Sequence, residues 1–211
     1  MDLNEPFIRT DHPPHKPRLK RKVFSLARLF MKVILLVVIS SLSIHLPDIT
    51  ERTQNREQTI GEIKGVLEKH SKDMDEGTKR ELAEAIYEES LYYNHDPKFI
   101  LALISIESSF QNMSVSERGA KGLMQLMPYV AESLAQELGI EWKGDPTLFN
   151  PFLNVRMGIH YLSRLVLDFN DIRVAMAAYN YGPTYVRGLI ERKESIPANY
   201  YHRVITVYQT L

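Results

Sequence analysis

The side chains best suited to chemistry in this sequence stand in three short stretches. The first is Glu107, which closes the apolar run LALISI at residues 101–106. On a helix, Glu107 would share one face with Ile100, Leu103 and Ile104. Apolar neighbours disfavour the ionised carboxylate, so the pKa would rise toward neutrality, as general acid catalysis requires. The polar residues that follow leave a second interpretation open, in which Glu107 simply reaches solvent at the helix end.

The other two stretches pair amides with apolar or aromatic side chains. SERGAKGLMQLMP, residues 116–128, is a glycine-containing loop in which Gln125 stands among leucines and methionines. A surrounded amide needs hydrogen-bond partners, either in the protein or on a ligand. AAYNYGP, residues 177–183, places Tyr179 and Asn180 at a predicted helix end. An aromatic ring beside amides suits a sugar, although each such residue taken alone is more often a core or capping residue.

Helix signals follow one another through the region that must position these side chains. Asp96-Pro97 and Asn150-Pro151 each combine an N-cap with proline at the first helical position, and Asp171 is a further predicted cap. Thr78 to Glu81 is predicted to be a capping box that opens another helix. Because no convincing run of alternating β-branched residues occurs, we expect an all-α, single-domain fold over residues 59–211.

The N-terminal region has a different composition. Residues 1–22 are basic and contain several prolines, which predicts a disordered cytoplasmic tail. Lys32 is the one full charge in residues 29–46, so residues 23–46 are predicted to be a transmembrane anchor. A cleaved signal peptide is the alternative, and the length of the polar leader favours the anchor. The polar residues 47–58 are expected to form a linker.

Composition excludes several classes of site. There is no cysteine, so disulfides and thiolate metal sites are excluded. Residues 1–47 carry eight Lys/Arg and three Asp/Glu, a net +5, whereas the remaining 18 and 23 give −5. An acidic body argues against nucleic-acid binding, which needs a basic face. The seven histidines lack the HExxH spacing, and we expect neither a metal nor a cofactor.

Four motifs occur together in one order along the chain. They are Glu107-Ser108 followed by Phe110, GAKGLMQLMP at 119–128, NPFLNVRMGIHYL at 150–162 and AYNYGP at 178–183. Over residues 85–205 the sequence thereby resembles the lytic transglycosylase domain of bacterial cell-wall enzymes. This family is related to goose-type lysozyme, within the mostly helical, α+β lysozyme-like superfamily.

The resemblance implies a reaction and a set of site residues. Glu107 would be the single catalytic acid/base, cleaving the β-1,4 bond between N-acetylmuramic acid and N-acetylglucosamine. The muramyl C6 hydroxyl would close on C1 to leave a 1,6-anhydromuramyl end, so the second carboxylate of ordinary glycosidases is not needed. The residues that would contact or surround the glycan are Ser108, Ser116, Met124, Gln125, Tyr179, Asn180 and Tyr200.

Two positions depart from the family pattern, and two other functions stay open. Tyr181 stands where AYNAGP has a small residue, and Val130 replaces a frequent threonine.

A muramidase that hydrolyses the same bond would need a further acidic group, for which Glu117 and Asp145 are the nearest candidates. A non-catalytic cell-wall glycan-binding protein is the other alternative.

The topology and the resemblance lead to the same location. Basic residues before the predicted anchor place the N-terminus in the cytoplasm and the body on the periplasmic or extracellular side. We therefore expect a single-pass protein of the bacterial cytoplasmic membrane. Its expected partners are peptidoglycan glycan strands and that membrane, without nucleic acid. The sequence does not identify which proteins it binds.

Overall fold

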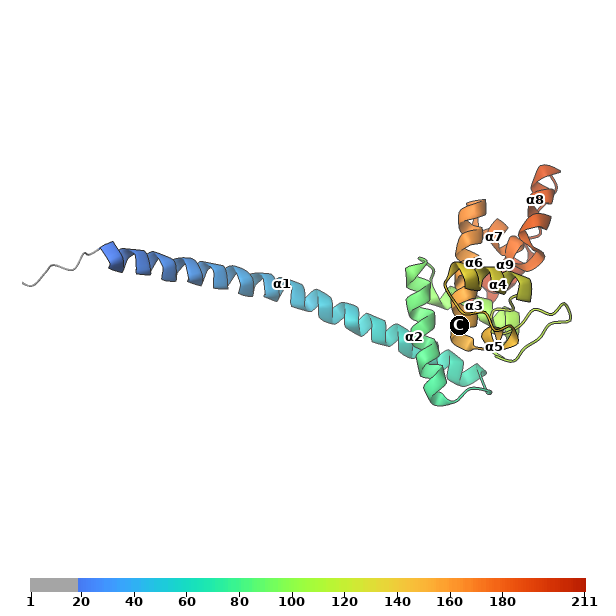
Figure 1. Ribbon diagram of the computed structural model, residues 1–211, viewed down its shortest axis with the longest axis horizontal. Coiled ribbons are helices and arrows are strands. Elements are labelled where there is room, and N and C mark those ends of the chain that lie inside the picture. The colour runs from blue at the N-terminus through green and yellow to red at the C-terminus, as the bar shows by residue number, and fades with distance from the viewer. Residues whose placement is uncertain (1–18) are drawn as a thin grey trace, which may run out of the picture. The chain divides into compact units, whose positions relative to one another are not determined.

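A computed structural model describes the backbone of residues 19–211 and the side chains of residues 27–41 and 51–211. The chain divides into two compact units, residues 1–54 and 55–211. Most of the predicted tail, residues 1–22, lies outside the described residues, and its last four residues are helical. Helix α1 runs from Leu19 to His70 (Figure 1).

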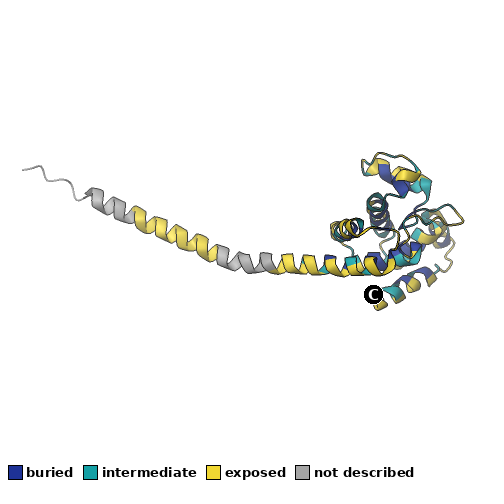
Figure 2. Cartoon of the chain, turned by 90° about the horizontal axis from the view of Figure 1, so that it is seen from below, coloured by how far each residue is buried: buried dark blue, intermediate teal, exposed yellow. Residues whose placement is uncertain are grey.

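The described part of the predicted anchor is helical and exposed. Every residue from 27 to 41 is exposed, and these residues are drawn in yellow in Figure 2. The rest of the predicted 23–46 segment has side chains outside the described set. Within the described side chains, no helix meets the length and hydropathy needed to cross a membrane.

The segment predicted to be a linker is helical. Residues 47–58 belong to α1 and are helical throughout. The stretch is rich in Glu, Gln and Arg, which have high helix propensity even where no apolar stripe guides them. The second compact unit begins at Asn55, within this helix.

The second unit is built from helices, so the expectation of a mostly helical fold is confirmed. Among the described residues no strand occurs, although the loop after α3 contains isolated β-bridges that join Val115 to Lys121 and Lys121 to Leu126. The helices after α1 are α2 (Glu76–Tyr92), α3 (Pro97–Ser108), α4 (Pro128–Glu137), α5 (Asp145–Leu148), α6 (Pro151–Phe169), α7 (Ile172–Tyr181), α8 (Pro183–Glu191) and α9 (Asn199–Thr210).

Most predicted helix starts are confirmed. Asp96, Asn150 and Asp171 each accept a hydrogen bond from a backbone N–H in the first turn of the helix that follows. The predicted capping box at Thr78 is wrong, because α2 begins earlier and Asp75 is its N-cap, accepting from the backbone N–H of Thr78. Asp is as good a cap as Thr and stands one turn upstream.

Helix α3 lies at the centre of the unit. Ile100, Leu101, Ala102, Leu103 and Ile104 are all buried. Helices α2 and α9 pack against α3, while α6 packs against α2 and α7. A helix buried on nearly every side is held by its neighbours, so the side chains in its last turn take fixed positions.

Candidate active site

Glu107 lies in the last turn of α3 and meets a tyrosine from the C-terminal helix. The Tyr200 hydroxyl, on α9, donates a hydrogen bond to Glu107 Oε1. Tyr200 is only 3% exposed. Desolvation by burial raises the pKa of Glu107 to about 7, although the Tyr200 hydrogen bond and the charge of Arg203 act to lower it. Of the two sequence interpretations, the partly buried acid is therefore the one that the geometry supports.

The end of α3 is fixed by an unusual backbone. Ser109 and Phe110 both have positive φ, 52° and 63°, and Phe110 is a bulky residue for which this conformation costs energy. The Phe110 ring is buried and stacks on His70, with centroids 5.4 Å apart. This burial offsets the backbone strain, so the chain turns sharply just after Glu107 instead of fraying into solvent.

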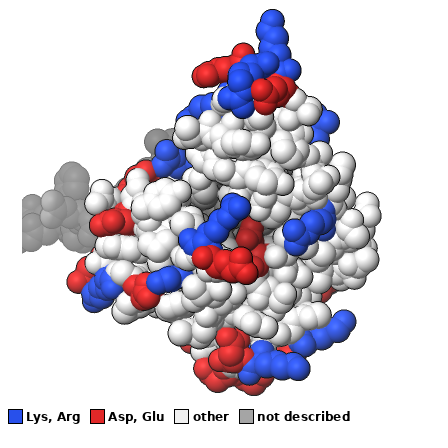
Figure 3. Space-filling view, turned by 90° about the vertical axis from the view of Figure 1, so that its right-hand side faces the viewer, with Lys and Arg blue, Asp and Glu red and all other residues white. Residues whose placement is uncertain are grey.

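A cavity of about 440 Å³ opens beside Glu107. On the face shown in Figure 3, basic and acidic side chains gather at the centre around a hollow, within largely uncharged surface. The cavity brings together five residues predicted from sequence, namely Glu107, Ser116, Gln125, Tyr179 and Asn180. Sequence reasoning missed the other lining residues Arg118, Ala120 and Met127, and named Glu117 only as a candidate second acid.

Gln125 finds its partners inside the protein. Its Nε2 donates to the carbonyl oxygens of Ser114 at 3.1 Å and Gly122 at 2.9 Å. Its backbone has φ of 48°, so the residue sits in a left-handed turn of the loop. Both amide donors therefore stabilise the loop wall, and the side chain lines the cavity in a fixed orientation.

Ser108 and Met124 lie outside the cavity lining, although both are next to it. The Ser108 side chain is buried and its hydroxyl donates to the carbonyl oxygen of Ile104 at 3.2 Å. The Met124 side chain is fully buried and fits against Gly158, where a Cβ would come within 2.4 Å of its sulfur. These two predicted contact residues thus support the site from within the core.

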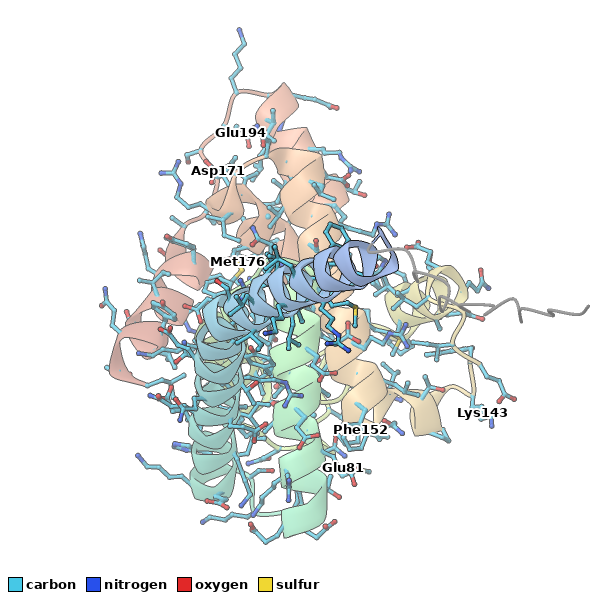
Figure 4. The ribbon with its side chains drawn as sticks, turned by 90° about the vertical axis from the view of Figure 1, so that its left-hand side faces the viewer. Glu81, Lys143, Phe152, Asp171, Met176 and Glu194 are labelled. Atoms are coloured by element: carbon cyan, nitrogen blue, oxygen red, sulfur yellow. The ribbon has the colours of Figure 1, made fainter. Side chains whose placement is uncertain are left out.

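Tyr179 links α7 to the loop wall. Its hydroxyl donates to the carbonyl oxygen of Met124 at 2.8 Å, and its ring lies 5.4 Å from that of Tyr161. Desolvation and the nearby Glu107 carboxylate raise the pKa of Tyr179 above its usual value, so the phenol stays neutral. Met176, three residues earlier on α7, is buried among the helices (Figure 4). Helix α7 therefore directs one face into the core and its C-terminal end to the cavity.

Asn154 is a structural residue that the sequence reasoning missed. It is fully buried on α6, where its Oδ1 accepts from the backbone N–H of Met124 at 2.8 Å. Its Nδ2 donates to the carbonyl oxygens of Lys121 at 3.1 Å and Leu148 at 2.9 Å. An amide on the apolar face of a helix was the available signal.

Gly122 allows the loop to reach this amide. The residue has φ of +81°, and a Cβ there would lie 2.2 Å from Asn154 Nδ2 and 2.5 Å from the carbonyl oxygen of Leu148. No side chain could occupy that space, and a positive φ is natural for glycine. The loop that forms the cavity wall is therefore fastened to α6 by one glycine and one buried amide.

The carboxylates proposed for a hydrolytic alternative have different surroundings. Glu117 lines the same cavity as Glu107, whereas Asp145 forms an ion pair with Lys121 at 2.5 Å. Among the described side chains, no group of three or more His, Cys, Asp or Glu is placed to hold a metal ion. Acid/base chemistry by Glu107 is the chemistry that this arrangement supports.

Known proteins resemble the chain over the region that builds this site. A putative soluble lytic murein transglycosylase of Haemophilus influenzae is 32% identical over 100 residues, covering 47% of this chain and 17% of the relative. The endo-type membrane-bound lytic murein transglycosylase A of Klebsiella pneumoniae is 43% identical over 74 residues, or 33% of this chain and 36% of the relative. The chain thus spans much less than two thirds of the length of either protein.

A solved structure and a family model agree with these relatives. The 70 kDa soluble lytic transglycosylase of Escherichia coli aligns with a TM-score of 0.53 and 26% identity, covering 59% of this chain and 23% of that one. The model of the family described as "Transglycosylase SLT domain" matches residues 84–201, more than half of the chain. The chain therefore belongs to the transglycosylase SLT domain family.

Proposed function

We propose that the protein is a peptidoglycan lytic transglycosylase in which Glu107 is the catalytic acid/base. The observation that carries the proposal is the Glu107 carboxyl, with its pKa raised to about 7, at the wall of a cavity that amide, hydroxyl and aromatic groups also line. A carboxyl with such a pKa is partly protonated near neutral pH and can both give and take a proton. Membership of the SLT family supports this assignment.

The proposed reaction needs two proton transfers at one carboxyl. Protonated Glu107 gives its proton to the glycosidic oxygen between N-acetylmuramic acid and N-acetylglucosamine as the bond from C1 breaks. The resulting carboxylate accepts the proton of the muramyl C6 hydroxyl, whose oxygen forms the new bond to C1. The proton balance closes without water, and Glu107 returns to its starting state. Tyr200 acts as a positioning residue, because its hydroxyl binds Oε1 and leaves Oε2 to carry the proton.

Under this proposal, some cavity residues contact the glycan and others only shape the groove. Ser116 and Asn180 are exposed side chains of the lining, suited to hydrogen-bond the hydroxyl and acetamido groups of a glycan. Gln125 and Tyr179 line the cavity while their donors are held by backbone carbonyl groups. We assign these two residues to shaping the groove, with Ser108 and Met124 supporting it from the core.

Hydrolysis of the same bond is the second candidate function. Glu117 lines the cavity together with Glu107, and glycosidases that use water employ a pair of carboxyl groups. In that reaction Glu117 would activate water, and the product would carry a reducing end. The two reactions therefore differ in the mass of the product by one water.

Digestion of purified peptidoglycan followed by mass analysis of the released muropeptides tests the proposal. We expect anhydromuramyl products from the wild-type chain and a loss of about 100-fold or more for Glu107→Gln, which keeps the shape and removes the acid. Glu132→Gln changes an exposed glutamate on α4 and serves as the matched control. Equal digestion by wild type and Glu107→Gln would exclude Glu107 as the catalytic acid, and no digestion by the wild type would leave only a glycan-binding role. Reducing ends that disappear in Glu117→Gln would establish the muramidase.

We also propose that residues 23–46 anchor the protein in the cytoplasmic membrane, with the body outside. Support comes from the described apolar side chains between Leu29 and Ile39, which are exposed and have basic residues before them. Membrane fractions washed with alkaline carbonate should retain the full chain and lose a variant that lacks residues 23–46. Release of the full chain by that wash would contradict the anchor.

A further inference from the structure

Two exposed tyrosines stand together where α7 ends and α8 begins. Tyr181 is the last residue of α7 and Tyr185 lies in the first turn of α8. Their ring centroids are 6.0 Å apart with the planes tilted by 47°. The residues are 41% and 50% exposed. Single exposed apolar side chains need no explanation, but two rings in mutual contact form a surface on which a ligand can rest.

The pair directly follows a lining residue of the proposed active site and is held in place by the two helices that carry it. Asn180, which lines the cavity, immediately precedes Tyr181 in α7. Gly182 connects the helices with φ of 92°, and Pro183 fixes the first position of α8. Ala178 of α7 and Val186 of α8 are buried in one cluster, which holds the two helices and their rings together, so binding a ligand would cost little conformational entropy.

The chemistry of the pair suits a saccharide. The faces of pyranose rings carry C–H groups that pack on aromatic rings, and tyrosine hydroxyls can hydrogen-bond to the sugar hydroxyls at the edge. A glycan strand that passes through the cavity must leave it at each end. A strand that leaves the cavity past Asn180 would reach the tyrosine pair, because Tyr181 directly follows Asn180 in α7.

We propose that Tyr181 and Tyr185 form an additional glycan-binding platform for sugar units beyond those held in the cavity. The inference rests on the proposed function, because it takes the cavity to hold the scissile bond. The platform makes the enzyme select longer glycan strands over short ones.

Steady-state kinetics on glycan strands of defined length test the platform. For the full-length Tyr181→Ala, Tyr185→Ala and doubly substituted proteins, we expect KM for long strands to rise about three- to tenfold, with kcat unchanged. KM for strands that fill only the cavity should stay the same. Tyr92→Ala is the matched control, since Tyr92 is 79% exposed, ends α2 and also contacts a second tyrosine ring.

A binding assay separates this proposal from the proposed reaction. Glu107→Gln protein is co-sedimented with intact peptidoglycan, with and without the tyrosine substitutions, so turnover plays no part. Weaker sedimentation of the doubly substituted protein supports the platform even if the reaction proves to be hydrolysis. Equal sedimentation, or a KM increase of the same size for short and long strands, would overturn it. Tyr181→Trp should keep the long-strand KM of the wild type, which a purely structural role would not predict.

Discussion

Two carboxyl groups of the same domain have opposite electrostatic surroundings. Glu107, at the end of α3, meets a neutral phenol within packed side chains, and burial raises its pKa to about 7. Glu137, at the end of α4, is hydrogen-bonded to Arg164 and to the His160 ring. Burial acts to raise the pKa of Glu137 as well, but these hydrogen bonds and charges outweigh it, and the pKa is lowered.

The difference shows what turns a glutamate into a proton donor. A carboxylate beside a guanidinium is stabilised as an anion and cannot supply a proton near neutral pH. Tyr200 can bind Oε1 of Glu107 without supplying a positive charge, so desolvation remains the dominant effect. The identity of the hydrogen-bond partner therefore separates the candidate catalytic acid from a structural ion pair.

The largest predicted effect on stability belongs to Glu107→Gln. In the unfolded chain the Glu107 carboxyl has its ordinary pKa of 4.5, so between that value and about 7 the folded protein binds more protons. Wild-type stability should therefore fall as pH rises through this window, by up to about 3 kcal/mol. Glu107→Gln should lack this loss and gain relative stability at higher pH. Urea unfolding of both chains at about pH 4 and about pH 8 measures it.

A constant stability difference between these two chains across the pH range would show that Glu107 titrates normally. Glu132→Gln provides the control, because its carboxylate is exposed on α4. The difference between variant and wild type cancels the titration of the other groups in the molecule.

Glu137→Gln should change the pH dependence of stability in the opposite direction from Glu107→Gln, and by a smaller amount. When the pKa of a carboxyl is lower in the folded protein than in the unfolded chain, its ionised form stabilises the fold at pH values above the unfolded pKa. This stabilisation disappears as the pH falls through the folded pKa. The substitution should cost at most about 1 kcal/mol near neutral pH, because the Glu137 side chain is 37% exposed and its ion pair is screened by solvent. The cost should shrink on acidification. A cost that grows toward low pH in the same unfolding experiment would contradict the comparison.

The smallest predicted effect is a shift of the pH–rate profile in Tyr200→Phe. The Tyr200 hydrogen bond lowers the pKa of Glu107, so its removal should raise that pKa. Activity requires the protonated acid, and the pH above which activity falls should therefore move upward. Tyr201→Phe, the neighbouring tyrosine on α9, is the control. An unchanged or downward-shifted alkaline limb would mean that the hydroxyl does not tune Glu107.

Local sequence signals were sufficient for much of the helical framework. Asp96, Asn150 and Asp171 start helices because a cap and the first-turn N–H groups it serves are only two or three residues apart. The predicted helix start was wrong where two possible caps stand close together: Thr78 was predicted to be the cap, but Asp75, three residues earlier, caps the helix. Residues 47–58 gave no local helix signal, because they lack an apolar stripe, yet they are helical.

The site depended on contacts that no local pattern contains. The sequence by itself determined that Glu107 shares a helix face with apolar residues, and that a glycine-containing loop follows it. Only the tertiary structure decided that Tyr200, 93 residues away, binds the carboxyl, and that Asn154 fastens the loop at Met124. The reason is physical: helix caps and periodicity act within a few residues, whereas desolvation and hydrogen bonding of a buried group depend on which distant segments pack around it.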